Sequence, residues 1–404
     1  MKLLLRSLTF LVALVLLTLM LQTWLGEVSR ALERGTTYRD SLAFYTGATL
    51  IWNGRADDLY DLETQRSLQE ELLPSQYRQD RPHQWDLLPF ISPPFVALAL
   101  APLAGLSLPV FYAVTGGLQV LLIAVLVVAL QRIANAWPES RRLLLLMLTV
   151  LWLPVSWSLM QGQMSTLLAV AFALGYLALR SDQGLLAGVV LSILWIKPQY
   201  AILVLPALLV WRRWLGAGAF AGATLVLLGA SWGTVGLDGL ASYTRFVTQI
   251  DTFGPEYSVF SANYNTLSGL LLRVFGVSGS VWLFFAGLLV ILTLLRARRG
   301  FGPESYALLI LTSVLVSLHT HSYDLAVLLP AAALGWDALK ERPVLAFTWA
   351  SLWFAVEVGL FALAFRGTQF EDAPLLTVPA MLLAVALLLL WRTARPVVPA
   401  AVRA

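Results

Sequence analysis

The sequence predicts an all-α polytopic membrane protein, and three observations support this fold class. Of its 404 residues, 59% are hydrophobic and only 12% are charged. Apolar runs of about 17–25 residues recur, which is the length that a helix needs to cross a bilayer. The 15 Trp and 12 Tyr residues suit the belts where a membrane protein meets the lipid–water boundary. We therefore expect one integral membrane domain over residues 1–404.

The apolar runs and the basic residues at their ends predict about twelve transmembrane helices. We expect the first run to remain as an uncleaved span, because no small-residue cleavage motif follows it. The apolar segment 90–103 is short and interrupted by prolines, so we place it at the interface or in a re-entrant turn. The expected spans are 3–25, 108–131, 142–158, 164–180, 184–196, 199–211, 217–235, 279–295, 304–318, 322–338, 344–364 and 374–391.

The distribution of charge gives the expected orientation. The connections assigned to the cytoplasm hold 16 Lys and Arg against 5 Asp and Glu, whereas the rest of the chain holds 11 and 18. By the positive-inside rule, we expect both termini in the cytoplasm of a bacterial inner membrane. Two long loops, 26–89 and 236–278, then face outward. In the first, apolar positions three and four apart predict amphipathic interfacial helices, one of them ending at Asn53-Gly54.

The composition excludes several classes of chemistry. There is no cysteine, so a thiolate nucleophile, an iron–sulfur cluster and a cysteine-ligated zinc are ruled out. With only three histidines in the chain, we expect neither a metal site nor a bound cofactor. The basic residues lie in short loops between apolar runs, where they set orientation, so we expect membrane lipids and no nucleic acid as partners.

Unusual polar residues gather at the outward ends of the predicted spans. Asp40 could act as a general base on a substrate hydroxyl, or it could cap the N-terminus of the first loop helix. Asp86 could be a second acid or bind a sugar hydroxyl, or it could belong to a rigid proline turn at the membrane face. Gln161 and Gln163 flank a glycine in an apolar hairpin, where they could bind substrate or satisfy backbone groups.

Later outward junctions carry cations and histidines. Lys197 is followed by Pro198 and could bind an anionic headgroup such as a phosphate, or it could extend to the membrane interface. The segment 319–324 (HTHSYD) holds two histidines and one Asp, a weak basis for zinc; phosphate or sugar binding and a structural role are the alternatives. Glu357 lies within a span, where it is either functional or paired with a neighbouring helix.

The order of these elements resembles glycosyltransferase family 87 of the GT-C superfamily, the polyprenol-phosphate-mannose-dependent mannosyltransferase-like proteins. The resemblance covers roughly residues 38–330. In the segment before the proline pair, Phe90-Ile91-Ser92 stands where a Tyr is expected. The matching elements are Asp40 with Tyr45 and Ala48, Asn53-Gly54 with Leu59-Tyr60-Asp61, Pro93-Pro94, Gln161-Gly162-Gln163, Lys197-Pro198-Gln199 and, more loosely, His319–Asp324.

The resemblance implies a GT-C-type fold and an inverting, metal-independent sugar transfer from a polyprenyl phosphate. The acceptor would be a glycolipid or a glycan at the outer membrane face, and mannose is the family's usual sugar. Asp40 would be the general base. Lys197, His319, His321 and Arg245 would bind the donor phosphate. The expected substrate-binding residues are Tyr45, Asp86, Gln161, Gln163, Gln199, Asn263 and Asp324.

Two other classes of function remain open on the sequence. A transporter or lipid flippase would also have many spans and buried polar residues, although such proteins tend to show two related halves and midplane sites. We find no half-repeat, and the polar residues lie at one boundary. A scaffold without catalysis is the other alternative.

Overall fold

The computed structural model describes residues 2–37, 39–73, 87–249, 265–276, 280–365 and 377–394. In these ranges the regular secondary structure is helical throughout, with no strand, and this confirms the predicted all-α class. Each of the twelve predicted spans coincides with one helix or with consecutive helices. These are α1 (Lys2–Arg34), α6 (Leu108–Ile133), α7 (Glu139–Leu151), α8 (Leu153–Gln161), α9 (Ser165–Arg180), α10 (Gly184–Ser192), η3 (Ile193–Ile196), α11 (Pro198–Ala201), α12 (Val204–Val210), α13 (Trp214–Gln249), α15 (Ser280–Ala297), α16 (Pro303–Leu315), η7 (Ser322–Val327), α17 (Leu328–Leu339), α18 (Pro343–Phe365) and α19 (Thr377–Ala394).

The apolar helices are those of a membrane protein. Within the described ranges, three helical stretches are long and apolar enough to cross a bilayer: Leu108–Ile133, Glu139–Gln161 and Trp214–Gln249. Other apolar helices, such as Ser165–Arg180 and Pro303–Leu315, are shorter. The number of twelve crossings and their orientation therefore stay predictions.

Prolines and glycines explain where the long apolar segments break. A proline lacks the N–H that continues a helix, and it pushes the preceding residue toward extended backbone. Lys197, just before Pro198, is extended at φ −127° and ψ 94° and separates η3 from α11. Within α13, Gly236 has φ +67°, so this helix is kinked. At the start of α8, Leu153 N donates a 3.1 Å hydrogen bond to Glu357 Oε1 of α18, which favours the alternative that Glu357 pairs with a neighbouring helix.

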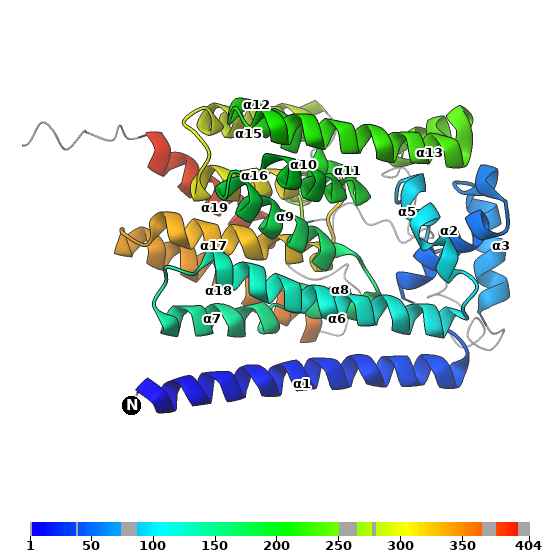
Figure 1. Cartoon of the computed structure of the whole chain (residues 1–404), viewed down its shortest axis with the longest axis horizontal. Helices are drawn as coiled ribbons and strands as arrows, with labels where there is room; N and C mark the ends of the chain where they lie inside the picture. The colour runs from blue at the N-terminus through cyan, green and yellow to red at the C-terminus, as the bar shows by residue number, and fades with distance from the viewer. Residues whose placement is uncertain are drawn as a thin grey trace, which may run out of the picture.

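Short helices form a layer at the end of the bundle opposite the N-terminus (Figure 1). This outer layer consists of α2 (Ser41–Trp52), η1 (Ala56–Asp58), α3 (Leu62–Leu72), α5 (Pro94–Leu100) and η2 (Ala101–Leu103), and α13 packs against α5 and η1. A further helix, α14 (Leu267–Phe275), precedes α15. The loop helix predicted to end at Asn53-Gly54 is confirmed, with Gly54 left-handed at φ +71°. However, α2 is buried over most of its length between α3, α5 and η2, because its apolar residues cover more than one face.

Two buried glutamines of α3 stabilise this layer. Gln65 Oε1 accepts a 2.7 Å hydrogen bond from Phe90 N, and its Nε2 donates to Leu59 O at 2.8 Å. Gln69 pairs in the same way with the backbone of Leu88, through bonds of 2.7 and 3.2 Å. Buried backbone outside regular secondary structure needs such bonds, because its N–H and C=O groups have no helix or sheet partner. The two side chains therefore fix the segment that leads into α5 and hold α3 against it.

The helices α10 and α13 approach each other closely at Gly188. A Cβ atom added there would lie 2.4 Å from Gly216 O and 2.6 Å from the Cβ of Ala219. Small residues allow such approach between apolar helices, where van der Waals packing is the main attraction. On α13 itself, Gly218 and Gly222 have no neighbouring atom within 4 Å of an added Cβ.

We expect Gly188→Ala to destabilise the protein by about 1–3 kcal/mol, because the added methyl group has no space between the two backbones. Gly222→Ala should be neutral or slightly stabilising, because this position is open and alanine favours helix. Thermal unfolding of the purified proteins in one detergent tests the pair. Equal unfolding midpoints for both variants would contradict the close approach.

Candidate active site

The Gln161-Gly162-Gln163 turn brings the end of α8 to the start of α2. Gly162 ends α8 in the left-handed region at φ +71°, which glycine adopts without strain. Ser41 packs directly against Gly162, where a side chain would not fit, since an added Cβ would lie 2.7 Å from the Cβ of Ser41. This approach places Gln163 beside Asp40, and Gln163 Nε2 donates a 2.8 Å hydrogen bond to Asp40 Oδ2.

Asp40 does not act as a helix cap. It stands at the N-terminal boundary of α2 with helical dihedral angles of −58° and −21°, and its side chain makes no capping hydrogen bond. The carboxylate is partly exposed and is held from one side by the Gln163 amide. The structure therefore does not support the capping alternative.

The second charged group is a buried ion pair between Lys197 and Asp324. The Lys197 ammonium contacts Asp324 Oδ1, and the two side chains are 11% and 0% exposed. Ser165 Oγ donates to the same oxygen at 2.5 Å, and His321 N donates to Oδ2 at 3.1 Å. A buried carboxylate needs such partners because its desolvation is costly. Lys197 therefore does not extend to the interface but is fixed inside the protein by Asp324.

The segment 316–321, which connects α16 to η7, and the first residue of η7 are anchored on both sides. Asn265, which is fully buried, donates its backbone N–H to Thr320 O at 2.8 Å and its amide to Ser322 Oγ at 3.3 Å. From the proline break, Gln199 Nε2 donates to His319 O at 3.2 Å. Residues after Lys197 and residues before α14 thus hold this segment in place.

The aromatic rings of His319, His321 and Tyr323 lie beside one another near the two charged groups. The rings of His319 and His321 lie 4.6 Å apart, and the Tyr323 ring lies 5.2 Å from that of His321. Lys197 Nζ lies 5.2 Å from the Tyr323 ring centroid, and the Tyr323 hydroxyl is 3.2 Å from Gln163 Nε2. Asp40, Gln163, Lys197 and residues 319–324 thus form one polar cluster, which we call the charged cluster.

Burial keeps both histidines of the charged cluster neutral at pH 7. It lowers the pKa of His319 well below its ordinary value, and the nearby His321 and Lys197 lower it further. The pKa of His321 is also lowered by burial, against the opposing influence of Asp324 and Asp40. Neutral imidazoles can each accept and donate a hydrogen bond.

Of the other predicted site residues, Tyr45 and Arg245 make their hydrogen bonds outside the charged cluster. Tyr45 donates its hydroxyl to Leu106 O at 2.8 Å and packs on Phe111 at 5.2 Å between ring centroids. Arg245 is exposed on α13 and donates to Ser242 at 3.4 Å. For Gln161, the structure shows no side-chain hydrogen bond to another described residue. Asp86 and Asn263 lie outside the described residues, so all five stay predictions.

Two residues at the site were not named from the sequence: Ser165, which contacts Asp324, and Tyr323 of the charged cluster. Ser165 lies two residues after Gln163, and Tyr323 lies within the HTHSYD segment, so the motifs adjoin both positions. The sequence does not indicate which residues these side chains contact, since Ser165 and its partner Asp324 are 159 residues apart. The only available signal was a polar residue type next to a motif for Ser165 and within a motif for Tyr323.

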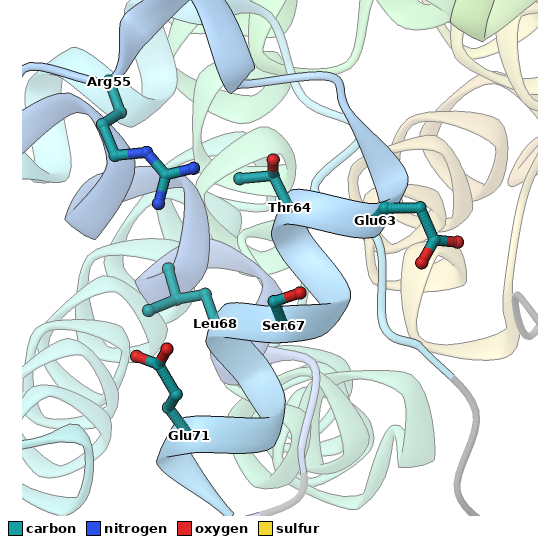
Figure 2. A pocket seen from close by; sticks show the side chains of 6 residues that line it. All are labelled: Arg55, Glu63, Thr64, Ser67, Leu68 and Glu71. Atoms are coloured by element: carbon teal, nitrogen blue, oxygen red, sulfur yellow. The ribbon is translucent and has the colours of Figure 1, made fainter.

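A hollow of about 210 Å³ lies on the outer layer and is distinct from the charged cluster (Figure 2). Its wall is formed by α3 and by Arg55, which precedes η1 and forms an ion pair with Asp58. The hollow joins none of the residues in the charged cluster. Its lining consists of Arg55, Glu63, Thr64, Ser67, Leu68 and Glu71.

The fold and the charged cluster define an all-helical membrane protein with carboxylates, a lysine and histidines gathered at one site. The model of glycosyltransferase family 87 matches residues 90–320, more than half of the chain, so the protein belongs to this family and is a glycosyltransferase. The match includes Gln163, Lys197 and His319, while Asp40 and Asp324 lie outside it. No match was found among curated proteins or among solved structures.

The neutral histidines predict a pH dependence of stability. Below pH 6.5, the ordinary pKa of histidine, the unfolded chain takes up protons, whereas folded His319 resists protonation. The stabilisation is therefore present above this pH and is lost as the pH falls toward the lowered pKa. We expect the unfolding midpoint to fall between about pH 6.5 and 5, and His319→Gln to flatten this slope. The same slope in both proteins would contradict the assignment to His319.

Proposed function

We propose that this glycosyltransferase moves a sugar, with mannose as the first candidate, from a polyprenyl phosphate to a hydroxyl of a glycolipid or glycan. The reaction takes place at the outer face of the bacterial inner membrane. The observation that carries the proposal is the arrangement of Asp40, held by Gln163, close to Lys197 and the histidines of residues 319–324. Family membership favours this function over a flippase or a scaffold.

Asp40 is the better general base of the two carboxylates in the charged cluster. Asp324 is fully buried, and its two oxygens accept from Lys197, Ser165 and His321 N. A carboxylate occupied in this way cannot take a proton without losing those bonds. Asp40 is partly exposed, and the hydrogen bond from Gln163 orients its Oδ2. Geometry is the first requirement for a general base.

The transfer is a single displacement. Asp40 removes the proton of the acceptor hydroxyl while the oxygen of that hydroxyl bonds to the anomeric carbon of the sugar. The bond from that carbon to the phosphate oxygen breaks, and the electron pair leaves with the polyprenyl phosphate. Attack opposite the leaving group inverts the configuration. The remaining task is electrostatic, because negative charge accumulates on the departing phosphate.

Lys197 is the cation of the charged cluster that would stabilise the negative charge on the departing phosphate. The neutral His319 and His321 would serve as hydrogen-bond donors beside it. The positive charge of Lys197 is already opposed by Asp324, so a phosphate would share the ammonium with this carboxylate. An ammonium has three donors, which allows it to serve two partners. We propose that this sharing replaces a metal ion.

Asp40→Asn is expected to lower sugar transfer by about 10²–10⁴-fold, the usual contribution of a general base. The substituted side chain keeps an oxygen for the Gln163 amide, so the fold should persist. Transfer of radiolabelled mannose from purified polyprenyl-phosphate-mannose to membrane acceptors, with EDTA present, measures the effect.

The matched control for this experiment is Asp58→Asn, which removes an exposed carboxylate of the outer layer that pairs with Arg55. This variant should keep the wild-type rate. Full activity of Asp40→Asn would remove Asp40 from the mechanism, and activity lost to EDTA in the wild type would contradict the metal-independent reaction.

Removing Lys197 alone would leave Asp324 as an unpaired buried charge, which costs about 3–5 kcal/mol. We therefore expect Lys197→Met combined with Asp324→Asn to fold better than Lys197→Met alone. The double variant should still use the donor at least about 10-fold less well, because a charge-assisted contact to phosphate is lost. An unchanged apparent donor affinity in the folded double variant would contradict the phosphate role.

A further inference from the structure

Tyr323 lies between the two charged groups of the cluster. Its hydroxyl is 3.2 Å from Gln163 Nε2, the nitrogen that also donates to Asp40 Oδ2 at 2.8 Å. Its ring lies 5.2 Å from Lys197 Nζ, at the distance of a cation–π contact. One side chain, at the start of η7, thus contacts the residue that orients Asp40 and also the residue that pairs with Asp324.

The Gln163 amide depends on these two hydrogen bonds for its orientation. A primary amide has two N–H donors, and here they point to Asp40 and to the Tyr323 hydroxyl. Its Oε1 is buried and accepts no hydrogen bond from a described residue. Without the Tyr323 hydroxyl, the amide would keep only its bond to Asp40 and could rotate together with that carboxylate.

We infer that Tyr323 is a positioning residue that fixes the separation between the base and the phosphate-binding cation, an inference that rests on the proposed function. Its hydroxyl acts on Asp40 through Gln163, and its ring holds the Lys197 ammonium. In an inverting displacement the attacking hydroxyl and the leaving phosphate lie on opposite sides of one carbon. A misplacement of about 1 Å between the groups that serve them can cost about 10²-fold in rate.

The two parts of this side chain can be removed separately. Tyr323→Phe removes only the hydroxyl and should lower kcat about 10-fold with an unchanged KM for the polyprenyl-phosphate sugar, since only the orientation of Asp40 is affected. Tyr323→Leu also removes the ring and should in addition raise the donor KM about 3–10-fold, because Lys197 loses its cation–π partner.

The matched control is Tyr306→Phe. It removes a buried hydroxyl that lies outside the charged cluster and donates a 2.9 Å hydrogen bond to Phe172 O. It should leave both kinetic constants unchanged. Gln163→Met removes both hydrogen bonds of the amide and should therefore lower kcat at least as much as Tyr323→Phe does. It replaces Tyr323→Phe if size-exclusion chromatography shows that variant to be misfolded.

The outcomes separate this inference from the proposed function. If the wild type transfers sugar and Tyr323→Phe has the wild-type kcat, the positioning role is wrong. The role is also wrong if both variants at this position change kcat and KM in the same proportion, because a general loss of structure would do the same. A wild type that neither transfers sugar nor binds polyprenyl phosphate would overturn the proposed function, and this inference with it.

Discussion

The buried ion pair between Lys197 and Asp324 is the interaction on which the rest of the charged cluster depends. Moving two charges out of water costs several kcal/mol for each ion, and Coulomb attraction offsets this only with good geometry and further hydrogen bonds. Ser165 and the backbone of His321 supply those bonds. The pair joins the proline break after η3 to the start of η7, so it fixes two distant segments and the Tyr323 side chain beside them.

A local backbone requirement places Asp40 near this pair. Gly162 combines a left-handed backbone with a missing Cβ, and both are needed for α8 to end against Ser41. Proline produces the matching effect at Lys197, because Pro198 ends the helix and leaves the lysine extended. Two short motifs, each built around one conformationally special residue, therefore bring a carboxylate and an ammonium into one cluster from different helices.

Much of the fold could be predicted from the sequence, because apolar runs and helix-ending residues are local signals. The helix over 41–52, its end at Gly54 and the break at Pro198 follow from such signals. The burial of α2 could not be predicted, since it depends on how α3 and α5 pack around it. Gln163 and Lys197 could be singled out as unusual polar residues. Their partners Asp40 and Asp324 are 123 and 127 residues away, and no local pattern indicates a contact at that separation.

The charge of the cluster constrains how an anionic lipid could be bound. With both histidines neutral, Asp40 and Asp324 oppose the single positive charge of Lys197. A phosphate therefore cannot be bound by excess positive charge among these residues. Under the proposed function, it would draw on the remaining donors of the ammonium and on neutral donors nearby, while Ser165 and His321 N continue to stabilise Asp324. Weak net attraction also has a benefit for turnover, because a polyprenyl phosphate that was bound by several unopposed cations would be released slowly after transfer.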